Sequence, residues 1–324
     1  MGAIFGGRMP HAPAFVPGGF TCPPTAGQIT QFQSYCNELL SFIQNVYIPD
    51  VEKLASVYQD YYQLGRGYMN LISYGVFDLN TDGSSKLLAT GHVAGGSTVT
   101  QTVDTTAITE KVTYSWYNDS TNNLNPANGS TQPVQPKGQA YSWMKAPRYG
   151  GQPYEAGALA RMWVNGDYRN GISVMDRHRA RAYEARKIAT AMLGWLNQIV
   201  VGQPVYSTYT TPANAASVGL TEAPRGALGH WLQISKSKIS RYQIITPTCW
   251  NASPVDDAGL RGPLEQALLG TPVQNTTQPI EVLRIVHSFD PCLSCAVHVM
   301  RPKSGARIST WMPGPTQELG VAAS

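Results

Sequence analysis

Two cysteines and a histidine lie at three-residue intervals near the end of the chain, within the segment SFDPCLSCAVHVM. On a helix, each step of three residues turns by about 300°, so Cys292 and Cys295 would lie about 60° apart on one face. Asp290 is a good N-cap for such a helix, and the proline that follows it suits the first turn. A helix N-terminus also favours the thiolate form that binds metals. The spacing therefore predicts a metal held by both cysteines, with His298 serving a neighbouring site.

Other uses of the cysteine pair remain open on spacing alone. A zinc ribbon needs a second Cys-x-x-Cys, which this chain lacks. A thioredoxin-like pair normally follows a strand of a βαβ unit, and the surrounding sequence does not have that pattern. The two thiols could also be buried and inert, as we expect for Cys36 and Cys249. Two thiolates are too few for a soft metal that prefers four, so a metal site in this chain would be incomplete.

The composition narrows the class of protein. A chain of 324 residues is long enough for one large domain or two modest ones. Only 14% of the residues are charged against 42% that are hydrophobic, so we expect a partner to cover much of the surface. The net charge of +4 is modest, and the basic residues do not cluster with aromatic ones, which argues against nucleic-acid binding. Five widely spread cysteines do not indicate a disulfide framework.

No targeting segment is recognisable in the sequence. No apolar run is long enough for a membrane-spanning helix, and the N-terminus lacks the layout of a signal peptide, in which an apolar run follows a charged one. If the protein is exported, another chain must carry it.

The periodicity of apolar residues predicts a mainly helical chain with a central helix bundle and a smaller β-rich insertion at about 66–150. Asp50 is expected to cap the second helix, and a Pro/Ser/Thr-rich linker is expected after residue 200. The predicted helices are 29–46, 50–65, 155–164, 172–200, 263–270 and 279–289, and a hairpin is predicted from 229–234 and 241–247.

Four segments with distinctive sequences occur in order along the second half of the chain. Together they resemble the C-terminal region of the large, catalytic subunit of [NiFe] hydrogenases, particularly the membrane-associated uptake type. The opening stretch IFGGRMPHAPAFVPGG resembles an interior segment of the same subunit. The four segments are EAPRGALGHW (222–231), YQIITPTCWNASP (242–254), GPLEQALLGTPV (262–273) and EVLRIVHSFDPCLSCAVHV (281–299).

One departure from the family pattern is the absence of its second cysteine pair, an RxCGxC motif near the N-terminus of the subunit. The resemblance therefore implies an incomplete large-subunit fold, covering residues 1–298 here. Either the subunit is split between two chains, or the sequence is truncated. Alone, such a chain is expected to be inactive.

The resemblance implies a nickel–iron centre. Cys292 would be a terminal nickel ligand, and Cys295 would bridge nickel to an iron that carries CO and CN ligands. The reaction would be the reversible heterolytic oxidation of H2 to protons and electrons, and the electrons would leave through iron–sulfur clusters of a small subunit.

The residues around that centre also have counterparts in the family. Arg225 would lie over the open metal position with Asp290 nearby, and Pro224 would shape the same pocket. Because an arginine keeps its proton, electrostatic activation or proton handling is a better assignment for Arg225 than general base. Thr248 would hydrogen-bond a cyanide ligand. Without the resemblance, Arg225 is an ordinary surface charge and Thr248 an ordinary strand residue.

The end of the chain has two further implied roles. His298 would bind a separate magnesium or iron ion, helped by the backbone carbonyl of Ile244. In the family, a dedicated endopeptidase cleaves after this histidine once nickel is inserted. The resemblance thus implies cleavage between His298 and Val299, with removal of residues 299–324.

The implied partners are a small iron–sulfur subunit, a membrane cytochrome b, maturation proteins and the endopeptidase, and a separate chain carrying RxCGxC if the subunit is split. The implied location is the periplasmic side of the cell envelope, reached through the small subunit. One alternative is a non-catalytic scaffold or metal-binding relic of a hydrogenase. Another, a quinone-interacting subunit of the complex I type, usually lacks both cysteine pairs, so DPCLSC argues against it.

Overall fold

The computed structural model describes residues 1–9, 11–292, 299–300 and 307–308. One long helical stretch dominates the first part of the chain and consists of α2 (Ala26–Phe42), the π-helix η1 (Ile43–Tyr47) and α3 (Ile48–Val57). Thr25 and Gln28 begin it with a capping box: the Thr25 hydroxyl accepts a hydrogen bond from the Gln28 N–H, and the Gln28 side chain accepts one from the Thr25 N–H.

The predicted break before Asp50 is wrong, because the helix continues through this position. Pro49 has no N–H and would clash with the preceding turn of a regular helix. The π-helical turn directly before α3 is wider than a regular one, and it accommodates the proline without ending the helix. Asp50 therefore lies inside the first turn of α3 and does not cap it.

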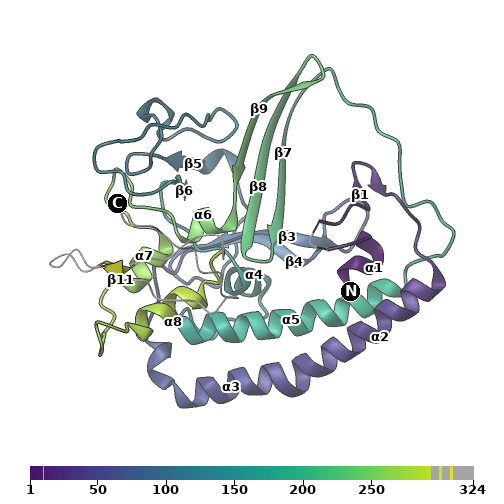
Figure 1. The fold of residues 1–324 in the computed structure, drawn as a ribbon, viewed down its shortest axis with the longest axis horizontal. Helices are drawn as coiled ribbons and strands as arrows, with labels where there is room; N and C mark the ends of the chain where they lie inside the picture. The colour runs from purple at the N-terminus through teal and green to yellow at the C-terminus, as the bar shows by residue number, and fades with distance from the viewer. Residues whose placement is uncertain (10, 293–298, 301–306, 309–324) are drawn as a thin grey trace, which may run out of the picture.

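The helix α5 (Val174–Leu196) is the element on which the other long helices pack. The stretch from α2 to α3 lies along it, and α8 (Ile280–Ser288) packs near its start (Figure 1). The predicted burial of Cys36 is confirmed: its side chain is fully buried, and its Sγ donates to the Ala189 carbonyl at 3.5 Å. Cys249 is only half-buried.

The hairpin within residues 71–93 belongs to the core of the molecule. It pairs β3 (Leu71–Asp78) with β4 (Lys86–Val93) in an antiparallel register, and α4 (Ala158–Asn165) packs on it. Leu71 and Leu88 from the strands meet Leu159 and Trp163 from the helix. A second antiparallel pair, β5 (Ile108–Lys111) with β6 (Ala146–Tyr149), lies in the same stretch of sequence. Strands thus occur where the β-rich insertion is expected, but their first hairpin is part of the main core.

A three-stranded antiparallel sheet is built from β7 (Asn214–Ala223), β8 (Gly226–Ser235) and β9 (Lys238–Ile245). The predicted hairpin is confirmed as β8 and β9, whose turn has positive φ at both Lys236 and Ser237, as a tight two-residue hairpin turn requires. The predicted linker after residue 200 is partly wrong, since β7 occupies its end. Most side chains of β7 are exposed, so the strand shows no apolar alternation in the sequence.

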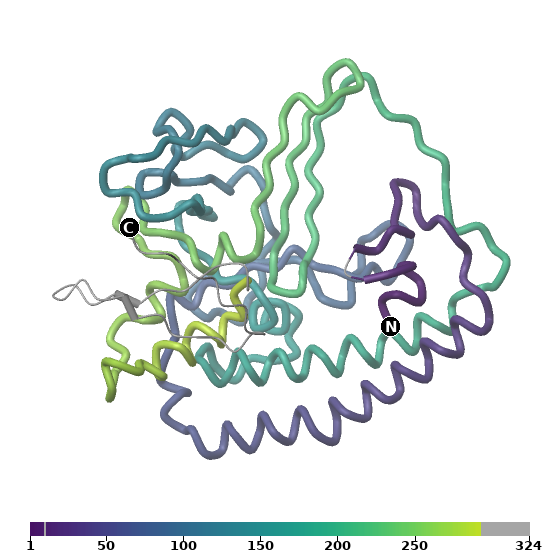
Figure 2. Tube along the Cα trace, viewed as in Figure 1, coloured from purple at the N-terminus to yellow at the C-terminus, as the bar shows by residue number. Residues whose placement is uncertain are grey.

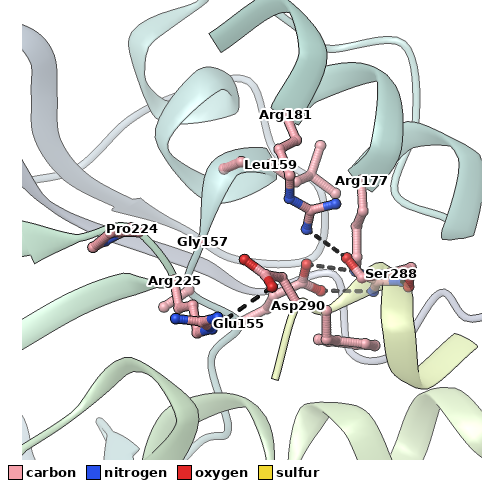
Figure 3. A pocket seen from close by; sticks show the side chains of 12 residues that line it. Glu155, Gly157, Leu159, Arg177, Arg181, Pro224, Arg225, Ser288 and Asp290 are labelled. Carbon is pink, nitrogen blue, oxygen red and sulfur yellow. Dashed lines mark hydrogen bonds and ion pairs between the residues drawn. The ribbon is translucent and has the colours of Figure 1, made fainter. Parts of the chain in front are cut away.

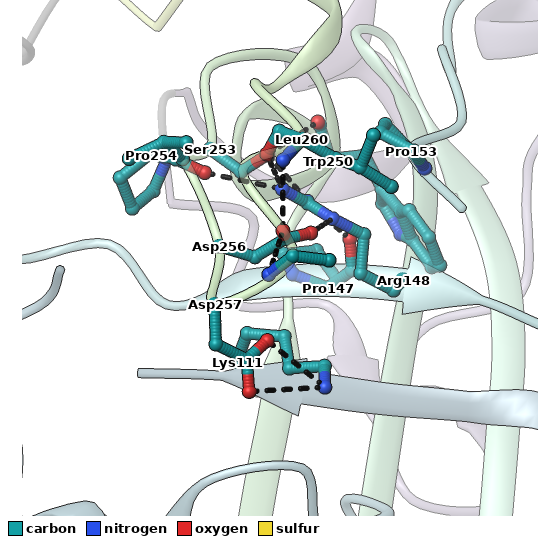
Figure 4. A network of polar contacts seen from close by, with 12 residues as sticks. Lys111, Pro147, Arg148, Pro153, Trp250, Ser253, Pro254, Asp256, Asp257 and Leu260 are labelled. Atoms are coloured by element: carbon teal, nitrogen blue, oxygen red, sulfur yellow. Dashed lines mark hydrogen bonds and ion pairs between the residues drawn. The ribbon is translucent and has the colours of Figure 1, made fainter. Parts of the chain in front are cut away.

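A buried arginine ties β6 to the loop that follows α6 (Pro247–Asn251) (Figure 4). The side chain of Arg148 has no exposed surface, and its Nε donates to Asp256 at 2.5 Å. It also donates to the Ser253 hydroxyl at 3.0 Å and to the Leu260 carbonyl at 2.9 Å. These contacts satisfy a buried charge and hold the loop in place.

Shorter elements complete the described structure. Figure 2 follows the chain through them, and among the described helices none combines the length and apolar character needed to cross a membrane. They are α1 (Gly2–Gly6), β1 (Phe15–Val16), β2 (Gly19–Phe20), η2 (Gln59–Tyr62), η3 (Thr105–Ala107), η4 (Asp119–Thr121), α7 (Pro263–Leu268), β10 (Val299–Met300) and β11 (Arg307–Ile308).

The expectation of a mainly helical chain is not confirmed, because 34% of the residues that the structure describes are helical and 22% lie in strands. The predicted helices at 155–164, 172–200, 263–270 and 279–289 are confirmed as α4, α5, α7 and α8. The strand content was underestimated because two strands lack the alternation of apolar and polar residues that predicts a strand. The residues of β7 are mostly exposed, and those of β3 are mostly buried.

Candidate active site around Arg225 and Asp290

Arg225 and Asp290 come from distant parts of the chain and face each other across a small cavity (Figure 3). Arg225 Nε lies 3.6 Å from Asp290 Oδ1, an ion pair too long for a hydrogen bond. Both side chains are about a third to two-fifths exposed, at 34% and 41%. Arg225 Nε is itself buried, and no described atom accepts a hydrogen bond from it. The site therefore keeps a buried donor aimed near a carboxylate, with a cavity of about 10 Å³ beside them.

The two-residue turn between β7 and β8 positions Arg225. Gly226, directly after it, has φ +132°, and a Cβ at this position would lie 2.6 Å from the backbone nitrogen of Gly157. Only glycine fits this conformation and this close approach. The turn is thus pressed against the start of α4, which fixes where the arginine side chain begins.

A second buried arginine holds the other side of the same turn. Arg161 on α4 donates to the Pro224 carbonyl at 3.0 Å and to Glu222 at 2.9 Å. It also makes a bidentate pair with Glu184 on α5, at 2.5 and 2.7 Å. Burial raises the pKa of Glu222 to about 7, and the charge of Arg161 limits that rise. Pro224 itself lines the cavity beside Asp290.

Asp290 lies just beyond the end of α8. Its backbone N–H donates to the His287 carbonyl at 3.0 Å, and its φ of +50° is the left-handed conformation that commonly ends a helix. The predicted role of Asp290 as the N-cap of a following helix is not seen, because residues 290–292 are not helical. The remainder of that predicted helix, including Cys295 and His298, lies outside the described residues.

Two arginines of α5 hold the end of α8. Arg177 makes a bidentate pair with Glu155, with both distances 2.7 Å, and its guanidinium lies 3.7 Å from the centre of the Phe289 ring. Arg181 donates to the Ser288 carbonyl at 2.7 Å. Burial lowers the pKa of Arg181 below its usual range, and the charge of Asp290 opposes that change.

Neither of these arginines was identified as a site residue from the sequence. The signal was present in the Arg-rich pattern of the helix at 172–200, where Arg177 and Arg181 are four residues apart and so share a face. Nothing in that pattern shows which face meets the end of α8.

Cys292 is half-buried. It lies two residues after Asp290, which lines the cavity. Its predicted partner Cys295 is outside the described residues. In the part of the chain that the structure describes, no three His, Cys, Asp or Glu side chains gather as a metal site.

Thr248 and Ile244 lie on consecutive elements that do not line the cavity. Thr248 is in the first turn of α6 and is 8% exposed. Ile244 is on β9, directly opposite His230 on β8, and its side chain is exposed. The structure thus joins Arg225, Pro224 and Asp290, and leaves Thr248 and Ile244 apart from that cavity.

The sequence of this chain matches a known protein family and several known proteins. The family model of nickel-dependent hydrogenases matches residues 1–171 and 167–298. The chain is 38% identical to the periplasmic [NiFeSe] hydrogenase large subunit of Desulfomicrobium baculatum, over 94% of this chain and 64% of that protein. It is 33% identical to the uptake hydrogenase large subunit of Rhizobium leguminosarum bv. viciae, over 92% of this chain and 61% of that protein.

Solved hydrogenase structures have a fold similar to that of this chain. The fold superimposes on a reduced, active form of the Ni-Fe-Se hydrogenase from Desulfomicrobium baculatum with a TM-score of 0.87 and 40% identity, covering 91% of this chain and 66% of that one. The predicted large-subunit fold is therefore confirmed. The chain spans less than two thirds of the length of the two curated relatives, and it matches their C-terminal part. With its sequence matched almost throughout and its fold shared, the chain belongs to the nickel-dependent hydrogenase family.

Proposed function

We propose that this chain is the C-terminal part of the catalytic subunit of a nickel–iron hydrogenase, which oxidises H2 reversibly to protons and electrons. The observation that carries the proposal is the Arg225–Asp290 pair at a cavity, two residues before Cys292. Unlike the buried arginine–carboxylate pairs that hold the fold together, this pair is partly exposed and lines a cavity. Because the chain covers less than two thirds of these relatives, the complete enzyme needs the remaining part of the subunit.

The described residues fit nickel and iron as far as they extend. Cys292 offers the soft sulfur ligand that these metals take up. Cys292 would be a terminal nickel ligand and Cys295 the bridge to an iron carrying CO and CN. The two other thiolates would come from an RxCGxC motif on the rest of the subunit. When bound, this centre supplies an open coordination position at which H2 is polarised.

The side chains at the cavity then handle charge and protons. Asp290 is partly exposed and can hold a proton released at the site on its carboxylate oxygen. Arg225 lies 3.6 Å from that carboxylate and supplies a positive charge that stabilises negative charge developing at the site. Pro224 limits the space beside them, and Arg161 keeps that proline in place through its carbonyl.

The other predicted residues complete this proposal. Thr248 would hydrogen-bond a cyanide ligand from the first turn of α6. His298 and the Ile244 carbonyl would hold a separate magnesium or iron ion. An endopeptidase, acting with maturation proteins, would cut between His298 and Val299 after nickel insertion.

The proposed partner for electron transfer is a small subunit with iron–sulfur clusters, linked to a membrane cytochrome b. A relative in Desulfomicrobium baculatum is described as periplasmic, and one in Wolinella succinogenes as quinone-reactive. These descriptions support a location on the periplasmic side of the cell envelope, reached through the small subunit.

Purification of the chain with its native partners tests the proposal. We expect nickel and iron by elemental analysis, CO and CN bands in the infrared spectrum, and H2-dependent reduction of a viologen dye. A Cys292→Ser variant should lose nickel, whereas a matched Cys22→Ser variant on the exposed surface should keep it. Absence of nickel and of the infrared bands from the wild-type assembly would refute the proposal.

A further inference from the structure

Two buried carboxylates share one arginine directly beside the turn that carries Arg225. Arg161 contacts Glu184 on α5 at 2.5 and 2.7 Å, and it contacts Glu222 near the end of β7 at 2.9 Å. The side chains of Arg161, Glu184 and Glu222 are 4%, 7% and 1% exposed. One positive charge does not balance two buried negative charges, so this group of three favours the uptake of a proton.

Glu222 is the carboxylate that takes up this proton. Its pKa is raised to about 7, chiefly by burial, and the charge of Glu184 adds to the rise. The charge of Arg161 and the backbone N–H of Tyr74 act in the opposite direction. Glu222 is therefore mostly neutral below about pH 7 and mostly charged above it.

The titratable and charged groups around Glu222 come from four elements, and they either contact it or line the same cavity. The Tyr74 phenol stays neutral in this pH range, because burial and the nearby Glu222 raise its pKa above the usual range. The groups are Arg161 from α4, Glu184 and Arg181 from α5, Tyr74 from β3, and Asp290 beyond the end of α8.

The charged form of Glu222 makes two contacts at once. Its Oε1 accepts a hydrogen bond from the backbone N–H of Tyr74 at 2.6 Å, and its Oε2 accepts one from Arg161 Nη1 at 2.9 Å. Protonation removes the charge of the ion pair and turns one oxygen into an O–H donor. The Tyr74 N–H is fixed in a strand, whereas Arg161 is a side chain that can move. The contact with Arg161 is therefore the one that weakens.

A weaker contact with Glu222 reaches the turn at Arg225 through the same guanidinium. Nη1 of Arg161 also donates to the Ala223 carbonyl at 3.1 Å, and its Nη2 donates to the Pro224 carbonyl at 3.0 Å. These two carbonyls belong to the residues directly before Arg225. Because a guanidinium is planar and rigid, it cannot move away from Glu222 without changing both distances. The charge on Glu222 thus affects where the Arg225 side chain begins.

The pair of Arg225 and Asp290 is sensitive to a small displacement of that turn (Figure 3). Arg225 Nε lies 3.6 Å from Asp290 Oδ1, just beyond the range of a hydrogen bond. A shift of roughly 0.5 Å would close this gap or widen it further. We propose that Glu222, acting through Arg161, is a positioning residue that sets the distance between Arg225 and Asp290 differently in its charged and neutral forms. Its importance for H2 oxidation rests on the proposed function, whereas its effect on Arg225 does not.

The Nε–H signal of Arg225 tests this inference on the full chain without metal. The arginines are labelled with 15N, and their Nε–H signals are followed by NMR from about pH 5.5 to 8.5. Arg225→Lys identifies the signal by removing it. We expect the wild-type signal to shift with a midpoint near pH 7, because Glu222 titrates there.

Three variants separate Glu222 from other titrating groups. Glu222→Gln is uncharged at every pH, so its Arg225 signal should stay at the position that the wild type has at low pH. Glu184→Gln removes the second carboxylate, so the midpoint should move below pH 7. Glu38→Gln removes a charge from an exposed position on α2 and should titrate like the wild type. Circular dichroism checks folding, and the midpoint in Glu184→Gln decides alone if Glu222→Gln does not fold.

The rate of H2 oxidation by the assembled enzyme should follow the same change. We expect Glu222→Gln to equal the wild type near pH 6 and to be about tenfold slower near pH 8, at unchanged nickel content. Glu222→Asp keeps the charge on a shorter side chain and should restore part of the pH dependence.

An Arg225 signal that does not shift with pH, or that shifts alike in the wild type and in Glu222→Gln, would overturn the inference. The same holds for an unchanged midpoint in Glu184→Gln, and for parallel pH profiles of H2 oxidation in nickel-loaded wild type and Glu222→Gln. If the signal titrates as expected but the chain and its partners yield no nickel-loaded, H2-oxidising enzyme, that result counts against the proposed function alone.

Discussion

The buried pair of Arg177 and Glu155 makes a sharp prediction about how the site is held together. The two side chains are 2% and 6% exposed, and they share two hydrogen bonds of 2.7 Å. The arginine also stacks on Phe289, one residue before Asp290. Replacing it in Arg177→Met keeps a long apolar stem but removes the charge, and it leaves the Glu155 carboxylate buried without its partner.

The expected cost follows from this geometry. Leaving one charge of a buried pair uncompensated destabilises a protein by about 3–5 kcal/mol. Replacing both residues in Arg177→Met/Glu155→Met removes both charges together, and the expected cost is only about 1 kcal/mol. Glu155→Met alone leaves the Arg177 charge buried and should also cost about 3–5 kcal/mol. The coupling energy, which is the sum of the two single-variant costs minus the cost of the double variant, should therefore be about 5–9 kcal/mol.

Equilibrium unfolding in urea, followed by circular dichroism, measures these free energies on the full chain. Arg186→Met is the matched control, since Arg186 lies on the exposed side of the same helix and should cost no more than about 0.5 kcal/mol. A single-variant cost near that of the control, or additive effects in the double variant, would refute the view that this pair supports the end of α8.

Four further outcomes are expected. Gly226→Ala should lower the unfolding free energy by about 2 kcal/mol or more in a thermal melt, because its Cβ would collide with the start of α4. Glu222 has a pKa raised to about 7 in the folded chain from an ordinary 4.5, so it favours folding below pH 4.5, and this contribution is lost as the pH rises to 7. Glu222→Gln should flatten the pH dependence of the unfolding free energy across that window by up to about 3 kcal/mol. In the assembled enzyme, Arg225→Lys should reduce H2 oxidation roughly tenfold or more at unchanged nickel content, and unchanged activity would argue against its electrostatic role. Intact-mass measurement of the assembled enzyme should show the loss of residues 299–324, and a full-length mass would contradict cleavage after His298.

Local sequence signals determined many of the elements. The hairpin of β8 and β9 follows from alternating residues on either side of a short turn, and α5 from a long run of helix-forming residues. The break expected at Asp50 shows the limit of such signals. A proline next to an acidic residue normally starts a helix, but a π-helical turn allowed the existing helix to continue through it.

Some residues of the candidate site could be proposed from the sequence, and others became recognisable only in the structure. The order of segments such as EAPRG and SFDPCLSC was sufficient to propose Arg225, Pro224 and Asp290 together, and the structure brings them to one cavity. Arg161, Arg177 and Arg181 went unrecognised because each acts through contacts with residues far away in the sequence. Cys295 and His298 remain predictions, since both lie outside the described residues.

What the sequence determined by itself is the family, because four distinctive segments occur in order along the chain. The metal ligands among them stay a prediction that follows from this resemblance. Only the tertiary structure decided which charges are buried and where the apolar surface is uncovered. Burial of Arg161 and Arg177 depends on α4, α5 and α8 packing together, and exposure of Leu54 and Val57 depends on which of the described elements pack against α3. Both are properties of contacts between distant segments, which no local pattern of residues specifies.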